Sequence, residues 1–270
     1  MTPKKLMDIK SILDDYHDRF NCPSFIESDP IQIPHSFSKP EDIEIAAFLA
    51  SSLAWGNRRS IISSSRRLLG LMDNAPHDFI LGAKEKELSR FSSFAHRTFN
   101  GEDCEFFVRA LGRIYRDCGG LGNLFESSYL RTHDLRETLG LFRDEFLRAE
   151  HFPRSEKHIS DARKGSAAKR LNVFLMWMVR RDANGVHFGL WRKIPMSALL
   201  IPLDVHCGNV ARSLGILTRK QNDWKAVEEL TAVLRSFDPE DPVRYDFALF
   251  GMGVNRVRIP SCGGKGFPSR

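Results

Sequence analysis

The sequence predicts an all-α fold, and three observations support this prediction. Apolar residues recur at three-and-four spacing along most of the chain, as at Leu135, Leu139, Phe142 and Phe146. Alternation of apolar and polar residues, which is typical of strands, is nearly absent. The 270 residues are 42% hydrophobic and include 20 Phe, enough to fill a substantial core without disulfides or metal.

The expected helices begin at caps or prolines and end where the apolar pattern stops. Ser38-Lys39-Pro40-Glu41 has the form of a capping box with proline in the first turn, and the helix that follows is expected to end at Gly56. Residues 23–34 read as an irregular connector, and residues 119–122 read as a loop. Apolar spacing places the other helices at residues 3–20, 58–73, 103–118, 134–150, 168–181, 205–214, 223–236 and 240–254.

Composition favours a cytoplasmic protein. The N-terminal residues lack the apolar run of a signal peptide, and no stretch approaches ~18 uninterrupted apolar residues. An odd number of scattered cysteines argues for reduced thiols: Cys22, Cys104, Cys118, Cys207 and Cys262. The adjacent His206 and Cys207 have no second pair to complete a metal site, so we expect no metal.

The net charge of +6 is unevenly distributed. Residues 154–270 hold 20 Lys and Arg against 11 Asp and Glu, whereas residues 1–153 hold 20 against 23. A basic half attracts phosphate backbones and speeds their encounter with the protein. Surface solubilisation explains the same asymmetry and stays open as an alternative.

Two segments of the basic half contain residues suited to covalent chemistry. Lys169 opens an apolar helix beside Lys164 and Arg170, and Asp204 precedes a second helix. Lysine attacks carbon only as the neutral amine, which burial, neighbouring cations and a helix N-terminus all favour. A carboxylate such as Asp204 is able to assist this attack. The alternative is a solvated basic helix start and an aspartate that only caps a helix.

The two segments resemble the active site of the helix-hairpin-helix DNA glycosylase superfamily. Its hairpin has the form L-P-G-[IV]-G-x-K-T-A, and Gly165 and Lys169 match the first glycine and the catalytic lysine, while Ala167 replaces the second glycine. Leu203-Asp204-Val205-His206, followed by Arg212, is similar to the segment that carries the family's aspartate. Further similar segments are residues 47–58 and 245–253, so the resemblance covers residues 38–260.

The distance of 35 positions from Lys169 to Asp204 implies an insertion within residues 180–195. This separation is similar to that of the archaeal 8-oxoguanine glycosylases and of an uncharacterised bacterial family related to them. The iron–sulfur motif C-x6-C-x2-C-x5-C of the endonuclease III branch is missing, because only Cys262 lies in that region, so no cluster is expected.

The resemblance implies two helical lobes with a cleft between them. Residues 38–190 would form a six-helix barrel-like bundle with a degenerate helix-hairpin-helix, and residues 1–37 and 191–270 would form the second lobe. It also implies a monomeric, nucleoid-associated base-excision repair enzyme that flips a damaged base, preferably an oxidised purine, out of double-stranded DNA. Lys169 would then attack the sugar and form a Schiff base, and Asp204 would stabilise positive charge on the sugar.

Further site residues follow from their positions in the matched segments. The DNA-binding residues would be Asn57, Arg58, Lys164, Gly165, Ser166, Arg170, His206 and Arg212. The base pocket would be formed by Trp55, Trp177, Trp191 and Asp246. Core packing is the alternative for Trp177, a helix cap for Asn57, and an ordinary helix-face position for Asp246 and His206.

Two other functions stay open. A noncatalytic nucleic-acid-binding protein would keep the fold and the basic face, and the replacement of a hairpin glycine by Ala167 is compatible with it. A helical scaffold for protein interactions would show no salt-dependent affinity for DNA, so binding at two salt concentrations separates it from the other functions.

Overall fold

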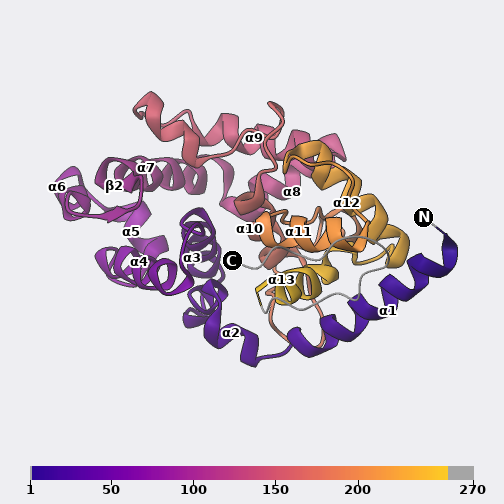
Figure 1. Cartoon of the computed structure of the whole chain (residues 1–270). Coiled ribbons are helices and arrows are strands. Elements are labelled where there is room, and N and C mark those ends of the chain that lie inside the picture. The colour runs from indigo at the N-terminus through magenta and orange to yellow at the C-terminus, as the bar shows by residue number, and fades with distance from the viewer. Residues whose placement is uncertain (1, 255–270) are drawn as a thin grey trace.

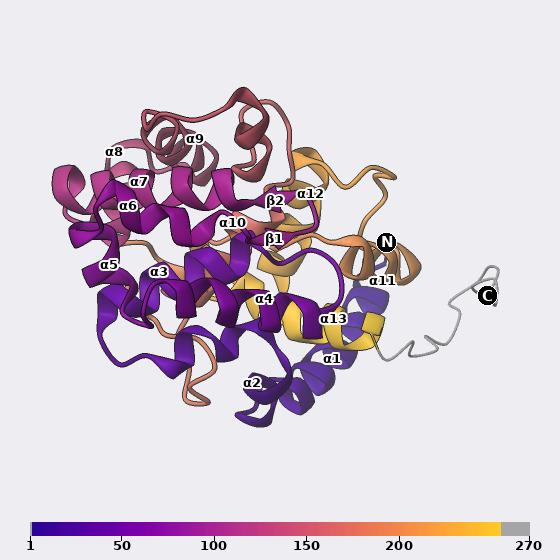
Figure 2. The same cartoon turned by 90° about the vertical axis from the view of Figure 1, so that its left-hand side faces the viewer.

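The computed structural model describes residues 2–254, and in them the all-α prediction is confirmed (Figures 1 and 2). The only strands in this range, β1 (Ala95–His96) and β2 (Phe99–Asn100), form one short antiparallel pair. The α-helices are α1 (Pro3–Phe20), α2 (Ser24–Ser28), α3 (Pro40–Ser52), α4 (Arg58–Leu71), α5 (Pro76–Gly82), α6 (Glu85–Leu88), α7 (Gly101–Cys118), α8 (Leu121–Thr132), α9 (Leu135–Phe146), α10 (Lys169–Val179), α11 (Val205–Leu214), α12 (Trp224–Phe237) and α13 (Asp246–Val254).

Short 3-10 turns complete the described secondary structure. They are η1 (Pro30–Gln32), η2 (Pro34–Ser36), η3 (Ser89–Phe91), η4 (Pro153–His158), η5 (Met196–Ala198) and η6 (Pro242–Tyr245). The region read as an irregular connector therefore contains α2, η1 and η2. None of the helices described is long and apolar enough to cross a membrane.

The capping box expected at Ser38 is wrong. Helix α3 begins at Pro40 with Lys39 as its N-cap, and no side chain caps it. Instead, Glu41 and Asp42 in the first turn offset the positive end of the helix dipole. The helix also ends at Ser52, four residues before Gly56.

The first of two hydrophobic clusters has Phe48 of α3 at its centre. The Phe48 ring lies 5.4–5.7 Å, centroid to centroid, from Phe107, Phe142, Phe146 and Phe174, which come from α7, α9 and α10. Ring pairs at such distances stabilise a core by about 0.5–1.5 kcal/mol each beyond their burial. Aromatic packing therefore fixes the position of α10, the helix that begins at Lys169.

The second cluster joins the two ends of the described chain. Its buried members come from α1, the segment after Leu200, and helices α11, α12 and α13. Helix α1 lies against α13, where a Cβ added at Gly251 would come within 2.3 Å of the Phe20 ring. Tyr245 also donates to Asp14 at 3.1 Å. The division into two clusters has the general form of two lobes, whereas the boundaries at residues 38 and 190 remain a prediction.

Residues 180–195 connect the clusters. Arg180 is buried, and its guanidinium donates to Asp182 at 2.6 Å and to Asp241 at 2.8 Å. Asn21, directly after α1, donates to Asp182 at 2.7 Å. A buried cation needs such partners, so this segment ties α10 to both α1 and η6.

Candidate active site

The turn before α10 gives Lys169 its position. Gly165 has a φ of 89° and donates its N–H to the Ala162 carbonyl at 3.0 Å, and Ala168 has a φ of 45°. A positive φ is uncommon for a residue with a Cβ, so surrounding contacts must hold Ala168 there. The Ala168 N–H donates to the Ser166 Oγ at 3.2 Å, and the backbone N–H of Trp224 donates to the Gly165 carbonyl of the same turn at 3.0 Å.

Asp204 is the N-cap of α11. Its Oδ1 accepts from the Cys207 N–H at 2.8 Å, and its carbonyl accepts from Asn222 at 3.1 Å. The capping role considered for this residue is therefore real. The cap bond occupies one carboxylate oxygen, the Cys207 thiol also lies against this carboxylate, and the side chain is half-buried.

Asp246 begins α13, and both Lys169 and Asp204 lie close enough to change its pKa. Burial raises its pKa to about 7, the charge of Asp204 adds to this rise, and the charge of Lys169 opposes it. The buried thiol of Cys207 shows the same neighbours: its pKa is raised by burial and by Asp204 and Asp246, and Lys169 acts in the opposite direction. Lys169 and Asp204 therefore act on the same two groups and belong to one electrostatic site.

A further carboxylate in this site was missed in the sequence. Asp29 is buried at the start of η1, where its Oδ1 accepts from the Ile31 N–H at 3.1 Å. Burial raises its pKa, while Arg58, 3.7 Å away, and Lys169 counteract the rise. An aspartate before a proline is a signal for a helix cap, but the sequence contains nothing that connects it with Lys169.

Lys169 itself is half-buried. Its Nζ makes no hydrogen bond, and no ion pair within 4.0 Å, with any residue between 2 and 254. Lys169 acts electrostatically on Asp29 and Asp246, and Asp204 acts on Asp246, so the amine lies near carboxylates without a direct bond to any of them. This arrangement leaves Nζ available for reaction with a substrate that enters between them.

The family model for a protein of unknown function, DUF2400, matches residues 29–255. The chain belongs to this family. No curated protein and no solved structure matches the chain. The region shared with DUF2400 includes Asp29, Lys169, Asp204 and Asp246, whereas α1 lies outside it.

The assignment of two residues to the base pocket is wrong. Trp177 and Trp191 are only 4% and 2% exposed. Trp191 stacks on Phe125 at 5.1 Å, and its Nε1 donates to Glu44 at 2.7 Å. Because both indoles are enclosed in the first cluster, neither has a free face for an extruded base.

Trp55 is half-buried beside the site. The guanidinium of Arg170 lies 4.8 Å from its ring, and the imidazole of His158 stacks on the ring at 5.8 Å. Arg170 also donates to the Ser52 carbonyl at 2.7 Å, and burial lowers its pKa to about 10, so it remains a cation at neutral pH. Its assignment as a DNA-binding residue is corrected, because the side chain holds the end of α3.

Arg58 and Arg212 also serve internal contacts. Arg58 stands over the Phe250 ring at 4.6 Å in addition to facing Asp29. Arg212 donates to the Arg219 carbonyl at 2.8 Å and to Asn222, which holds the Asp204 carbonyl. Both arginines therefore support the site rather than extending from it.

The other expected DNA-binding residues are accessible. Lys164 has an 81% exposed side chain, and Ser166 and His206 are also exposed, while Gly165 is half-buried. Asn57 is exposed as the N-cap of α4, where its side chain accepts from the Arg59 N–H at 2.9 Å. The alternative that Asn57 caps a helix is therefore confirmed. Val205, next to Asp204, is 65% exposed although it is apolar.

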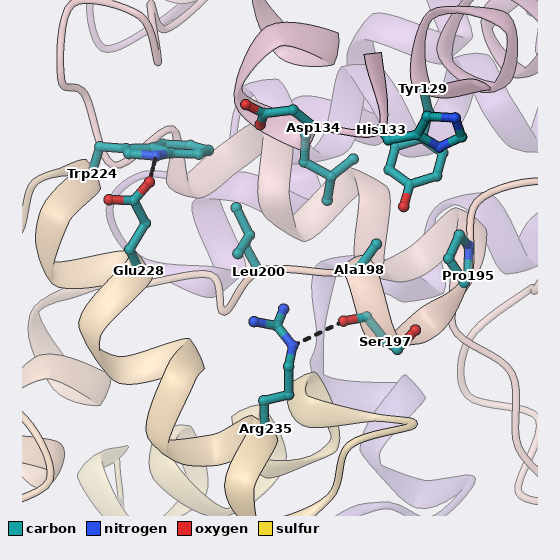
Figure 3. A pocket seen from close by; sticks show the side chains of 11 residues that line it. Tyr129, His133, Asp134, Pro195, Ser197, Ala198, Leu200, Trp224, Glu228 and Arg235 are labelled. Atoms are coloured by element: carbon teal, nitrogen blue, oxygen red, sulfur yellow. Dashed lines mark hydrogen bonds between the residues drawn. The ribbon is translucent and has the colours of Figure 1, made fainter. Parts of the chain in front are cut away.

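A pocket of about 470 Å³ lies away from Lys169, between the first cluster and α12. Figure 3 shows Trp224 and Glu228 on one side and Tyr129 and Pro195 on the other. Arg235 reaches into the space between them and donates to the Ser197 carbonyl at 3.1 Å. Lys169, Asp204 and Asp246 do not line this pocket, so it is separate from the carboxylate site.

Within residues 2–254 no three His, Cys, Asp or Glu side chains are grouped closely enough to hold a metal ion. Cys262, the single cysteine in the region of the missing cluster motif, lies outside the described residues.

Proposed function

We propose that the protein is a DNA base-excision glycosylase with lyase activity, which removes a damaged base, preferably an oxidised purine, from double-stranded DNA. One observation carries the proposal: Lys169, an amine without a direct partner among the described residues, opens a helix in the same electrostatic site as the N-cap carboxylate Asp204.

The reaction begins when Lys169 Nζ attacks the anomeric carbon of the flipped nucleotide. The glycosidic bond breaks with its electron pair going to the base, and the sugar opens to a Schiff base. Asp204 stabilises positive charge on the sugar. Strand cleavage by β-elimination follows. The proposed chemistry uses no metal, cofactor or iron–sulfur cluster.

Exposed groups around the site supply the DNA contacts. Lys164 and Ser166 lie in the turn before α10, and the first turn of α10 has no side-chain cap, so its backbone N–H groups suit a phosphate. The segment Trp55-Gly56-Asn57 connects α3 with α4 and fills the space that the flipped nucleotide leaves. We propose that the protein acts as a monomer in the cytoplasm, in association with the nucleoid.

Borohydride trapping tests the proposal directly. The protein is incubated with duplexes that contain an abasic site or one of a panel of oxidised bases, and borohydride reduces any Schiff base to a stable adduct. We expect an adduct with wild type and with Lys86→Gln, a matched loss of an exposed lysine on α6, and none with Lys169→Gln. No adduct with wild type on any duplex would overturn the proposal.

A noncatalytic nucleic-acid-binding function is the second candidate. The cap bond from the Cys207 N–H favours it, because this bond gives Asp204 a purely structural reason to be present. This candidate predicts salt-dependent binding of duplexes by wild type without an adduct.

A further inference from the structure

We propose that Asp246 is a further catalytic residue, which accepts the proton that Lys169 must lose before it attacks, while Asp204 stays ionised beside the sugar. This inference rests on the proposed function and divides the work of its site between two carboxylates. It is carried by the different surroundings of the two side chains.

Asp204 lies where a negative charge is stabilised. Its Oδ1 accepts a backbone N–H at 2.8 Å at the N-terminus of α11, where the helix dipole also favours an anion. A carboxylate held in this way is a weak base. It is suited to stabilising positive charge that develops next to it.

Asp246 lies where a proton is retained more easily. In the part of the chain that the structure describes, its carboxylate has one hydrogen-bond donor, the Cys207 thiol at 3.6 Å, which is a weak donor. The charged and titratable groups that face it are Asp204 and Cys207 from α11, Lys169 from α10 and Asp29 from η1. Burial is the main cause that raises its pKa to about 7, close to neutral pH; the charges of Asp204 and Asp29 add to the rise, and Lys169 and the Cys207 thiol oppose it.

This difference decides which carboxylate accepts the proton. General base catalysis is most effective when the base titrates near the working pH, and pairs of carboxylates with separated pKa values commonly divide the acid–base roles. At neutral pH Asp246 is ionised in a substantial fraction of molecules and becomes neutral when it takes a proton from the ammonium. The transfer neutralises both the ammonium and the carboxylate, which burial favours.

The protons balance over the reaction. Lys169 Nζ lies more than 4.0 Å from the Asp246 carboxylate, so its proton passes to Asp246 through one bridging water, and the neutral amine then attacks the anomeric carbon. The resulting secondary ammonium gives a second proton to the departing base, which has taken the glycosidic electron pair. When the bond from the anomeric carbon to the ring oxygen breaks, that oxygen takes the proton held by Asp246. The Schiff base keeps the last proton, and Asp246 is again a carboxylate.

The experiment measures single-turnover rates of adduct formation on an abasic or lesion duplex between pH 5 and 9. For wild type we expect the rate to rise to a plateau with an apparent pKa near 7. Asp246→Asn should be slower by about 10²-fold at neutral pH and lose this titration, whereas Asp246→Glu should recover part of the rate. Glu240→Gln, the same chemical change at an exposed position, should behave as wild type.

The outcomes separate the two proposals. If wild type forms no adduct at any pH, the proposed function fails, and the role of Asp246 fails with it. If wild type reacts and folded Asp246→Asn keeps the same rate and pH profile, only the role of Asp246 is overturned. Cys207→Ala gives a second test if Asp246→Asn does not fold: loss of the thiol donor should move the apparent pKa upward, and an unchanged profile would contradict the inference.

Discussion

Asp204 and Asp246 are held by the same residue. The backbone N–H of Cys207 donates to Asp204 at 2.8 Å, and its thiol lies 3.6 Å from Asp246. Because Cys207 is buried in the first turn of α11, it keeps the two carboxylates at a fixed separation. Through Cys207, the helix cap Asp204 lies beside Asp246 in the proposed reaction site.

Two substitutions of Asp204 separate its structural and chemical roles. Asparagine caps helices as well as aspartate does, so Asp204→Asn should leave the melting temperature nearly unchanged but abolish adduct formation. Asp204→Ala should abolish it too and also destabilise the fold by about 1 kcal/mol, because the Cys207 N–H loses its acceptor. Thermal unfolding and borohydride trapping measure the two effects. An active Asp204→Asn would leave only the capping role.

The stability of the protein should depend on Asp246 in a defined pH window. Its pKa is about 7 in the folded chain against 3.8 as the reference value, so between these values the folded state binds a proton that the unfolded state has released. The contribution of this group to stability is therefore present at low pH and lost as the pH rises toward and through 7. Asp246→Asn cannot ionise, so the variant does not lose this stability as the pH rises.

Relative to wild type, Asp246→Asn should gain up to about 4 kcal/mol between pH 4 and pH 8, because the pKa values differ by about 3 units. Urea denaturation of both proteins across this range measures the difference. Glu240→Gln is the exposed control and should show no trend. A difference between Asp246→Asn and wild type that does not change with pH would contradict the assigned pKa.

Trp191→Phe should lower stability without affecting DNA binding. Its indole fills the first cluster and donates to Glu44, which also accepts from the Tyr115 hydroxyl at 2.8 Å. Loss of the donor and of part of the ring should cost about 1–3 kcal/mol of unfolding free energy. Chemical denaturation and a duplex-binding titration check this, and weakened binding by a folded variant would restore Trp191 as a base-pocket residue.

Lys164→Ala should weaken DNA binding at every sequence. The side chain is exposed and lies 3.8 Å from Asp161, a pair too exposed to stabilise the fold much. If it contacts a phosphate, its removal should reduce the slope of log affinity against log salt by about 1. Titrations at several salt concentrations measure the slope, and Lys86→Gln should keep the wild-type value.

Local signals in the sequence predicted the elements that depend on them. The helix at residues 3–20 was placed correctly because a proline starts it and one face is apolar, and Lys169 and Asp204 were placed correctly at helix starts. Helix α8 was missed because its start, Leu121-Gly122, belongs to a glycine-rich run. In the structure only Gly119 and Gly120 take positive φ, and they act as the connection before the helix.

The remainder of the site depends on tertiary packing. No pattern connects Asp29 with Lys169, which lies 140 positions later, because their proximity follows from the way η1, α10 and α13 pack. The internal contacts of Arg58, Arg170 and Arg212 could not be predicted for the same reason. A basic residue next to a motif suggests a phosphate contact, whereas its carboxylate, carbonyl and aromatic partners come from distant segments.

The packing of α1 against α13 has a consequence for biosynthesis. Ile9 and Leu13 emerge from the ribosome long before their apolar partners in α11, α12 and α13. Until those helices are synthesised, the apolar face of α1 stays exposed and is a target for chaperones and for self-association. Slow translation of the final third should therefore reduce the yield of folded protein, and a circular permutant that begins near residue 200 and carries α1 after α13 should be less sensitive to it.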